Sequence, residues 1–85
     1  MNIIPSKKFT SAARKFLKRH PQYKEKLEKA LYLLQSNPKH PSLRLHKLSG
    51  CENYSISLDM AIRIIVHFEG DNAFLLKIGT HDEVY

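Results

Sequence analysis

The run of residues 61–68 constrains the fold of this chain more than any other segment. It is rich in β-branched side chains, which favour a central strand. Turn-forming residues follow at 69–72, and residues 73–78 then form a second apolar run, so the two runs predict a hairpin. Residues 54–58 alternate polar and apolar side chains, as in a half-buried strand. The second half of the chain therefore predicts a sheet of mostly antiparallel strands.

The first half of the chain predicts two helices after a short edge strand at residues 2–5. Ser6 can cap the first helix, and Pro21 suits the first turn of the second, which Asn37-Pro38 ends. Apolar residues recur at helical spacing, at Phe9, Ala12, Ala13, Phe16 and Leu17 and then at Tyr23, Leu27, Ala30, Leu31 and Leu34.

Residues 43–48 are predicted to form the strand that links the helices to the hairpins. The expected fold is α+β, in the order β-α-α-β-β-β-β, with both N-terminal helices packed on one face of a mostly antiparallel sheet. The 85 residues are expected to form a single domain, residues 1–85, with a modest core. No regular structure is expected after Gly79.

Composition excludes several classes of protein. No apolar run is long enough to span a bilayer, and the first eight residues lack the long apolar stretch of a signal peptide, so a cytoplasmic protein without a membrane partner is expected. Cys51 is the only cysteine, which excludes a disulfide framework. The five histidines show no short ligand-pair spacing, so neither a metal site nor a cofactor is predicted.

Charge divides the chain into two unequal halves. Residues 1–50 carry twelve Lys and Arg against two acids, a net charge of +10, whereas residues 51–85 carry two against six, a net charge of −4. Such a basic half suits a polyanion such as RNA, or an acidic protein partner. Solvation of the helix surfaces is the alternative explanation.

Arg63 interrupts the run that otherwise requires burial. Alternation along the strand places Arg63 on the face opposite the helix-covered core, together with Ile65 and His67. A guanidinium on a central strand can bind a phosphate through two parallel hydrogen bonds. A structural ion pair with Asp59 or with an acid of the last hairpin is the alternative.

Other polar residues surround this open face in the predicted sheet. Only one of the adjacent His46 and Lys47 can point into it, and Arg44 alternates in phase with His46. Lys77 lies on the neighbouring strand, where a second cation near Arg63 and a lysine that covers apolar surface are equally expected. At the end of the chain, His81 and Tyr85 could move protons or stack on a base, or could belong to a plain polar tail.

The order of these segments resembles the RelE/ParE superfamily of toxins from bacterial type II toxin–antitoxin systems. A basic helical hairpin precedes the HKLSG segment, then come the strand arginine and the final GTHDEVY. The HKLSG and GTH segments are most similar to the YafQ branch of ribosome-dependent mRNA interferases. The resemblance implies active-site roles for His46, His81 and Tyr85, and a contact of Arg63 with the scissile phosphate.

The same resemblance implies the partners. They are an acidic antitoxin, mRNA and the ribosome, with Arg44, Lys47 and Lys77 as phosphate- or RNA-binding residues and no cofactor. Lys77 stands where many members have arginine. The YafQ branch also has a His and an Asp in the region that here is Ser57-Leu58-Asp59-Met60, where Asp59 is a loose match and no His occurs. A gyrase-directed ParE-like toxin and a non-catalytic antitoxin-binding module are therefore alternative functions.

Overall fold

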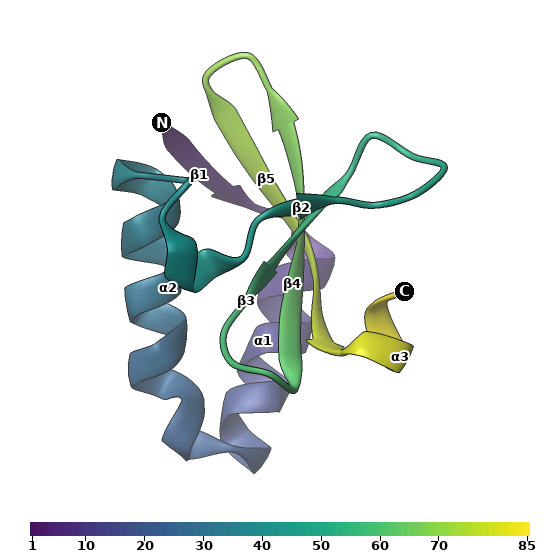
Figure 1. Cartoon of the computed structure of the whole chain (residues 1–85). Helices are drawn as coiled ribbons and strands as arrows, with labels where there is room; N and C mark the ends of the chain where they lie inside the picture. Colours follow the sequence, from purple (N-terminus) through teal and green to yellow (C-terminus); the bar gives the residue numbers. More distant parts are fainter.

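The computed structural model describes all of residues 1–85 and has the predicted α+β architecture (Figure 1). Its elements follow the order β1 (Asn2–Pro5), α1 (Lys7–Arg19), the 3₁₀ turn η1 (Pro21–Tyr23), α2 (Lys24–Ser36), the 3₁₀ turn η2 (Pro41–Leu43), β2 (His46–Lys47), β3 (Tyr54–Ser57), β4 (Ile62–Glu69), β5 (Asn72–Thr80) and α3 (His81–Val84). The sheet has the order β1-β5-β4-β3-β2. Only β1 and β5 are parallel; the other neighbours are antiparallel.

The core lies between the two long helices and one face of the sheet. Ser6 caps α1 as predicted, because its Oγ accepts a hydrogen bond of 3.0 Å from the Phe9 amide. The core contains half of the residues of the predicted helical stripes, together with Leu43 and alternate residues of the strands: Phe9, Ala13, Leu27, Ala30, Leu34, Leu43, Ile56, Ile64, Val66, Ala73 and Leu75. No helix has the length and apolar character needed to cross a membrane.

The predicted strand at residues 43–48 is wrong over most of its length. Leu43 ends the turn η2 and is buried in the core, and Arg44 follows in the left-handed conformation with φ of 48°. A strand cannot pass through that conformation, so regular pairing is confined to His46 and Lys47. Arg44 therefore does not alternate in phase with His46.

The end of the chain is a short helix, contrary to the expectation of no further structure. Thr80 caps α3 by accepting from the Glu83 amide at 3.3 Å, while the Glu83 carboxylate accepts from the Thr80 amide at 2.8 Å. This reciprocal pair is a capping box. Figure 1 shows α3 following the end of β5, apart from the two long helices.

Candidate functional site

The face of the sheet opposite the long helices presents two adjacent rows of side chains. Residues directly opposite one another in a sheet project to the same side. Register therefore aligns His46, Ser55, Ile65 and Lys77 across four strands. The next row contains Ser57, Arg63 and Gly79.

The helix α3 folds back over part of this face. Val84 is buried, and Gly79 permits the close approach: a Cβ atom at Gly79 would lie 3.0 Å from Glu83 Oε1 and 3.2 Å from Glu83 Cβ. Tyr85 then follows, with its amide donating to the His81 carbonyl at 3.0 Å. The tail is thereby fixed beside the row of His46.

Tyr85 has an aromatic contact with each of the two predicted catalytic histidines. Its ring centroid is 4.1 Å from that of His81 and 6.4 Å from that of His46, and both contacts are edge-to-face. Asp82 Oδ1 lies 3.6 Å from His81 Nδ1. Residues at positions 46, 81 and 85 of the chain are therefore brought together by β2 and the capped tail.

A cavity of about 440 Å³ opens at this place. His46, Lys77 and Tyr85 line it. The rest of its wall comes from the β2–β3 connection, the two inner strands and the tail: Leu48, Ser49, Cys51, Asn53, Ile65, Leu76 and Val84. The cavity combines an imidazole, an ammonium and a phenol above an apolar floor, which suits a ligand with a phosphate and a planar base.

Arg63 lies on the same face but in the neighbouring row and does not line this cavity. Two strand spacings, roughly 10 Å, separate its strand from that of His46. Its Nη1 donates to Ser57 Oγ and, at 2.9 Å, to the backbone carbonyl of Asp59. Nε and Nη2 have no hydrogen-bond partner in the protein. The ion pair with the Asp59 carboxylate, considered from the sequence, is not formed.

The Asp59 carboxylate instead accepts hydrogen bonds from the turn between β3 and β4 and from the helical hairpin. Burial by itself would raise its pKa, but hydrogen bonds from the Tyr23 hydroxyl, from the backbone amides of Ile62 and Ala61, and from Lys26 outweigh that effect and lower the pKa to about 2. The same contact with Asp59, aided by desolvation, raises the pKa of Tyr23. The sequence placed Tyr23 in the apolar stripe of the second helix but did not indicate its contact with Asp59, because 36 residues separate the two.

Two predicted RNA-binding residues lie away from the cavity. Arg44 follows η2, and its Nη1 lies 3.6 Å from the sulfur of Met60. Lys47 pairs with Tyr54 and so projects to the opposite side of the sheet from His46, as the alternation of adjacent residues required. Of the predicted cations, the structure places Lys77 in the cavity and Arg63 beside it.

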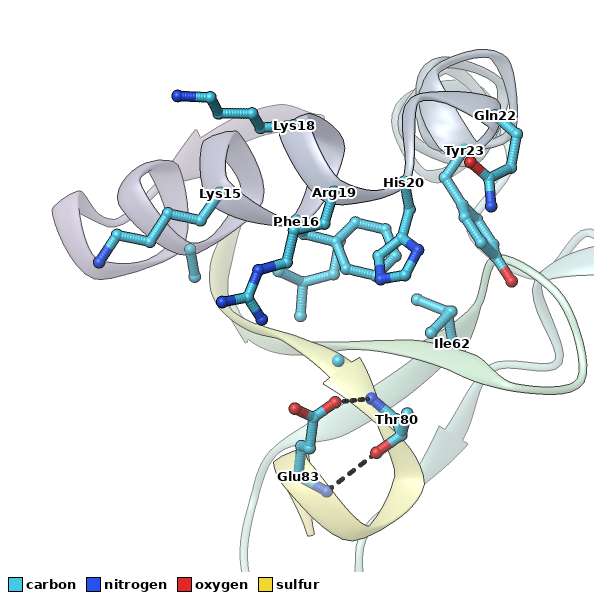
Figure 2. Close-up of a pocket in the computed structure, with 13 residues that line it drawn as sticks. Lys15, Phe16, Lys18, Arg19, His20, Gln22, Tyr23, Ile62, Thr80 and Glu83 are labelled. Atoms are coloured by element: carbon cyan, nitrogen blue, oxygen red, sulfur yellow. Dashed lines mark hydrogen bonds between the residues drawn. The ribbon is translucent and has the colours of Figure 1, made fainter.

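A second cavity, of about 640 Å³, lies between the end of α1 and α3 (Figure 2). Its floor is apolar, with Phe16, Ile62 and Ile78, and the basic side chains Lys15, Lys18 and Arg19 surround it. Figure 2 shows Arg19 pointing from α1 toward the capping box of α3. Helix α1 contains no acidic residue, so in this basic groove positive charge predicted from the sequence lies beside apolar side chains.

The carboxylate of Glu83 faces this groove from α3. The hydrogen bonds with the backbone and side chain of Thr80 lower the pKa of Glu83, and the positive charges of Arg19 and His20 lower it further. Glu83 therefore remains ionised, and it gives the basic groove one acidic side.

No group of three or more His, Cys, Asp and Glu side chains is placed to hold a metal ion.

Comparison of the sequence found no matching protein-family model and no matching curated protein. Solved structures with the same fold were found. A copper-bound mutant toxin from Helicobacter pylori is 19% identical, with a TM-score of 0.84 over 100% of this chain and 99% of the other. The E. coli DinJ-YafQ toxin-antitoxin complex contains a chain that is 17% identical, with a TM-score of 0.83 over 99% and 96%.

A YoeB/ParE toxin from Agrobacterium tumefaciens is more distant in both measures. It is 14% identical, and its TM-score is 0.77 over 95% of this chain and 99% of the other. The likeness extends over nearly the whole of each chain, so it covers the two helices, the sheet and the tail together. The resemblance to RelE/ParE toxins predicted from the sequence is confirmed at the level of the fold, and this chain has the fold of the YafQ and YoeB/ParE toxins.

Proposed function

We propose that this protein is the toxin of a type II toxin–antitoxin system and that it cleaves mRNA on the ribosome. One observation carries the proposal: His46, Lys77 and Tyr85 line one cavity, with His81 packed against Tyr85 and Arg63 in the adjacent row. Metal-independent cleavage of RNA needs a base, an acid and a cation, and these groups supply all three.

The proposed reaction is attack of the ribose 2′-oxygen on the adjacent phosphorus. A base removes the 2′ proton, the bond from phosphorus to the 5′-oxygen breaks, and an acid protonates the leaving 5′-oxygen. The products are a 2′,3′-cyclic phosphate and a 5′-hydroxyl. His46 and His81 share the roles of base and acid, and Tyr85 stacks on or orients a base of the message.

Lys77 and Arg63 stabilise the negative charge that builds up on the phosphate. Lys77 is the cation within the cavity, and the Nε and Nη2 of Arg63 face no protein acceptor. Donors fixed before the reaction contribute more than mobile ones, because they need no reorganisation in the transition state. The ribosome would orient the message for in-line attack.

The basic half of the chain supports the two proposed macromolecular partners. An acidic antitoxin would neutralise this positive charge in the resting complex. The structural neighbour YafQ forms a toxin–antitoxin complex with DinJ. Ribosomal RNA would bind the basic helices during cleavage, because phosphate contacts by Lys and Arg supply sequence-independent affinity. Cleavage of mRNA on ribosomes would take place in the cytoplasm.

Expression in cells tests the target of the toxin. Wild-type protein should arrest growth and shorten transcripts, and His46→Ala should do neither. His40→Ala removes a half-buried imidazole from the loop before η2, which accepts from the Ser42 amide and lines neither cavity, and this variant should remain toxic. DNA breaks with intact transcripts, and equal toxicity of His46→Ala, would instead identify a gyrase-directed toxin. Arrest by neither route would leave a non-catalytic antitoxin-binding protein.

A further inference from the structure

The turn between β3 and β4 is fixed by a single carboxylate. Asp59 Oδ1 accepts from the amides of Ala61 and Ile62, each at 2.9 Å. Asp59 Oδ2 accepts from the Tyr23 hydroxyl at 2.6 Å and from Lys26 Nζ at 3.3 Å. One oxygen thus closes the turn, and the other ties that turn to the start of the second long helix.

The backbone of the same residue holds Arg63. The Asp59 carbonyl accepts from Arg63 Nη1 at 2.9 Å, and Ser57, at the end of β3, accepts from the same nitrogen. The position of this carbonyl depends on the shape of the turn, and the shape of the turn depends on the Asp59 carboxylate. A chain of contacts therefore runs from Tyr23 through Asp59 to Arg63.

The contacts in this chain are of unequal strength. The Tyr23–Asp59 hydrogen bond is short and has an ionised acceptor, which makes it one of the stronger kinds. Lys26 contributes less, because its side chain is 54% exposed while that of Asp59 is only 26% exposed. Tyr23 also packs against Phe16, with ring centroids 5.2 Å apart, so its ring is held independently of the hydroxyl.

We propose that Tyr23 and Asp59 are positioning residues for Arg63. The hydroxyl of Tyr23 holds the carboxylate of Asp59, the turn presents its carbonyl to Arg63 Nη1, and the guanidinium is fixed with Nε and Nη2 directed to the phosphate of the message. The proposal rests on the proposed function in treating that phosphate as the ligand. Small displacements of a positioned group reduce reaction rates strongly, so loss of one distant hydroxyl should slow cleavage.

Tyr23→Phe tests this role with the smallest possible change, since it removes one hydroxyl and keeps the ring. Tyr32→Phe is the matched control: it makes the same change in α2, the helix that begins directly after Tyr23, at a side chain that is 67% exposed and makes no side-chain hydrogen bond. Asp59→Asn provides a second variant that alters the turn itself.

Two measurements are needed. The first is the ¹⁵N relaxation order parameter of the Arg63 Nε–H group in the isolated protein, which requires no activity. We expect it to fall in Tyr23→Phe and Asp59→Asn and to stay at the wild-type value in Tyr32→Phe. The second is mRNA cleavage on ribosomes, where Tyr23→Phe should lower kcat about tenfold or more with little change in KM.

A double variant shows whether Tyr23 acts through Arg63. If it does, Tyr23→Phe should slow the wild-type protein but should not slow Arg63→Ala any further. An unchanged order parameter in Tyr23→Phe, an unchanged kcat, or an additive loss in the double variant would each overturn the proposal. A wild-type protein that leaves mRNA intact would refute the proposed function, and the order parameter would still decide whether the network holds Arg63.

Discussion

The guanidinium of Arg63 makes structural contacts through Nη1, and its proposed phosphate contact uses Nε and Nη2. The alternation of residues 62–68 correctly predicted that Arg63 projects away from the helix-covered core. The sequence could not show that Nη1 would donate hydrogen bonds to Ser57 and to the Asp59 carbonyl. Those contacts depend on the shape of a turn, which periodicity does not describe. Arg63 therefore supports the turn as well as offering Nε and Nη2.

Replacement of Arg63 should separate its structural contacts from its proposed role in cleavage. Arg63→Ala should slow mRNA cleavage about 100-fold or more, through lost stabilisation of the transition state. It should also lower the free energy of unfolding by about 1 kcal/mol, since two hydrogen bonds disappear. Arg63→Lys should recover only part of the rate, because an ammonium cannot reproduce the guanidinium fork. Single-turnover kinetics and denaturant titration check both values, and full activity of a folded Arg63→Ala protein would reject the assignment.

Asp59 should make stability depend on acid pH. Its folded pKa of about 2 lies below the ordinary value of 3.8, so the carboxylate stabilises the fold above pH 3.8 and loses that contribution as pH falls toward 2. The contribution is on the order of 2 kcal/mol. Asp59→Asn should be less stable than wild type at pH 7, and the difference should shrink by pH 2. Urea titrations at the two pH values measure this difference in the free energy of unfolding. A difference that is the same at both pH values would show that the ionised Asp59 carboxylate does not stabilise the fold.

The elements that sequence reasoning missed are all short, although the short strands β1 and β3 were predicted. The two long helices and the β4–β5 hairpin follow from periodicity, because many residues repeat the same signal. The helix α3 has only four residues, yet the spacing of Thr80 and Glu83 is the S/T-x-x-E pattern of a capping box, so a signal was present in the sequence. Nothing in the sequence marked the left-handed Arg44 that ends η2.

The cap of α3 should matter for cleavage more than for stability. Thr80→Ala removes the acceptor of the Glu83 amide, and α3 should fray and release Tyr85 from the histidines. Ser6→Ala is the matched control, since it removes the cap of α1 on the other side of the sheet. We expect Ser6→Ala to lower the free energy of unfolding by about 1 kcal/mol, and with it Tm, while cleavage stays unchanged. Thr80→Ala should show the reverse: a small change in Tm and a clear loss of cleavage rate.

At the scale of the whole molecule, the basic residues and the cavity lie on different parts of the surface. The groove between α1 and α3 is lined by Lys15, Lys18 and Arg19 (Figure 2). The cavity on the open face is lined by Lys77. The composition predicted the net charge of the first half, but only the fold shows that three of those charges surround an apolar floor. The proposed partner binding and the proposed chemistry should therefore respond to different substitutions.

Binding of the proposed acidic antitoxin should depend on salt mainly through the association rate. Charges at the edge of an interface steer the encounter, and added salt screens them. Lys18→Glu with Arg19→Glu should slow association several-fold more than Lys39→Glu, which reverses one charge in the loop after α2. Stopped-flow measurements from low to high ionic strength provide the comparison. An association rate that is indifferent to salt would show that these charges do not steer the antitoxin.

We expect the cavity of His46, Lys77 and Tyr85 to cleave mRNA. The most direct test is incubation of pure, antitoxin-free protein with mRNA on translating ribosomes, followed by analysis of the RNA ends. A chelator selective for copper and zinc should be present, so that Mg²⁺ remains for the ribosome. We predict fragments with 2′,3′-cyclic phosphate and 5′-hydroxyl ends, formed about 100-fold or more slowly by His46→Ala. Intact mRNA with the wild-type protein would show that this cavity does not cleave mRNA on ribosomes.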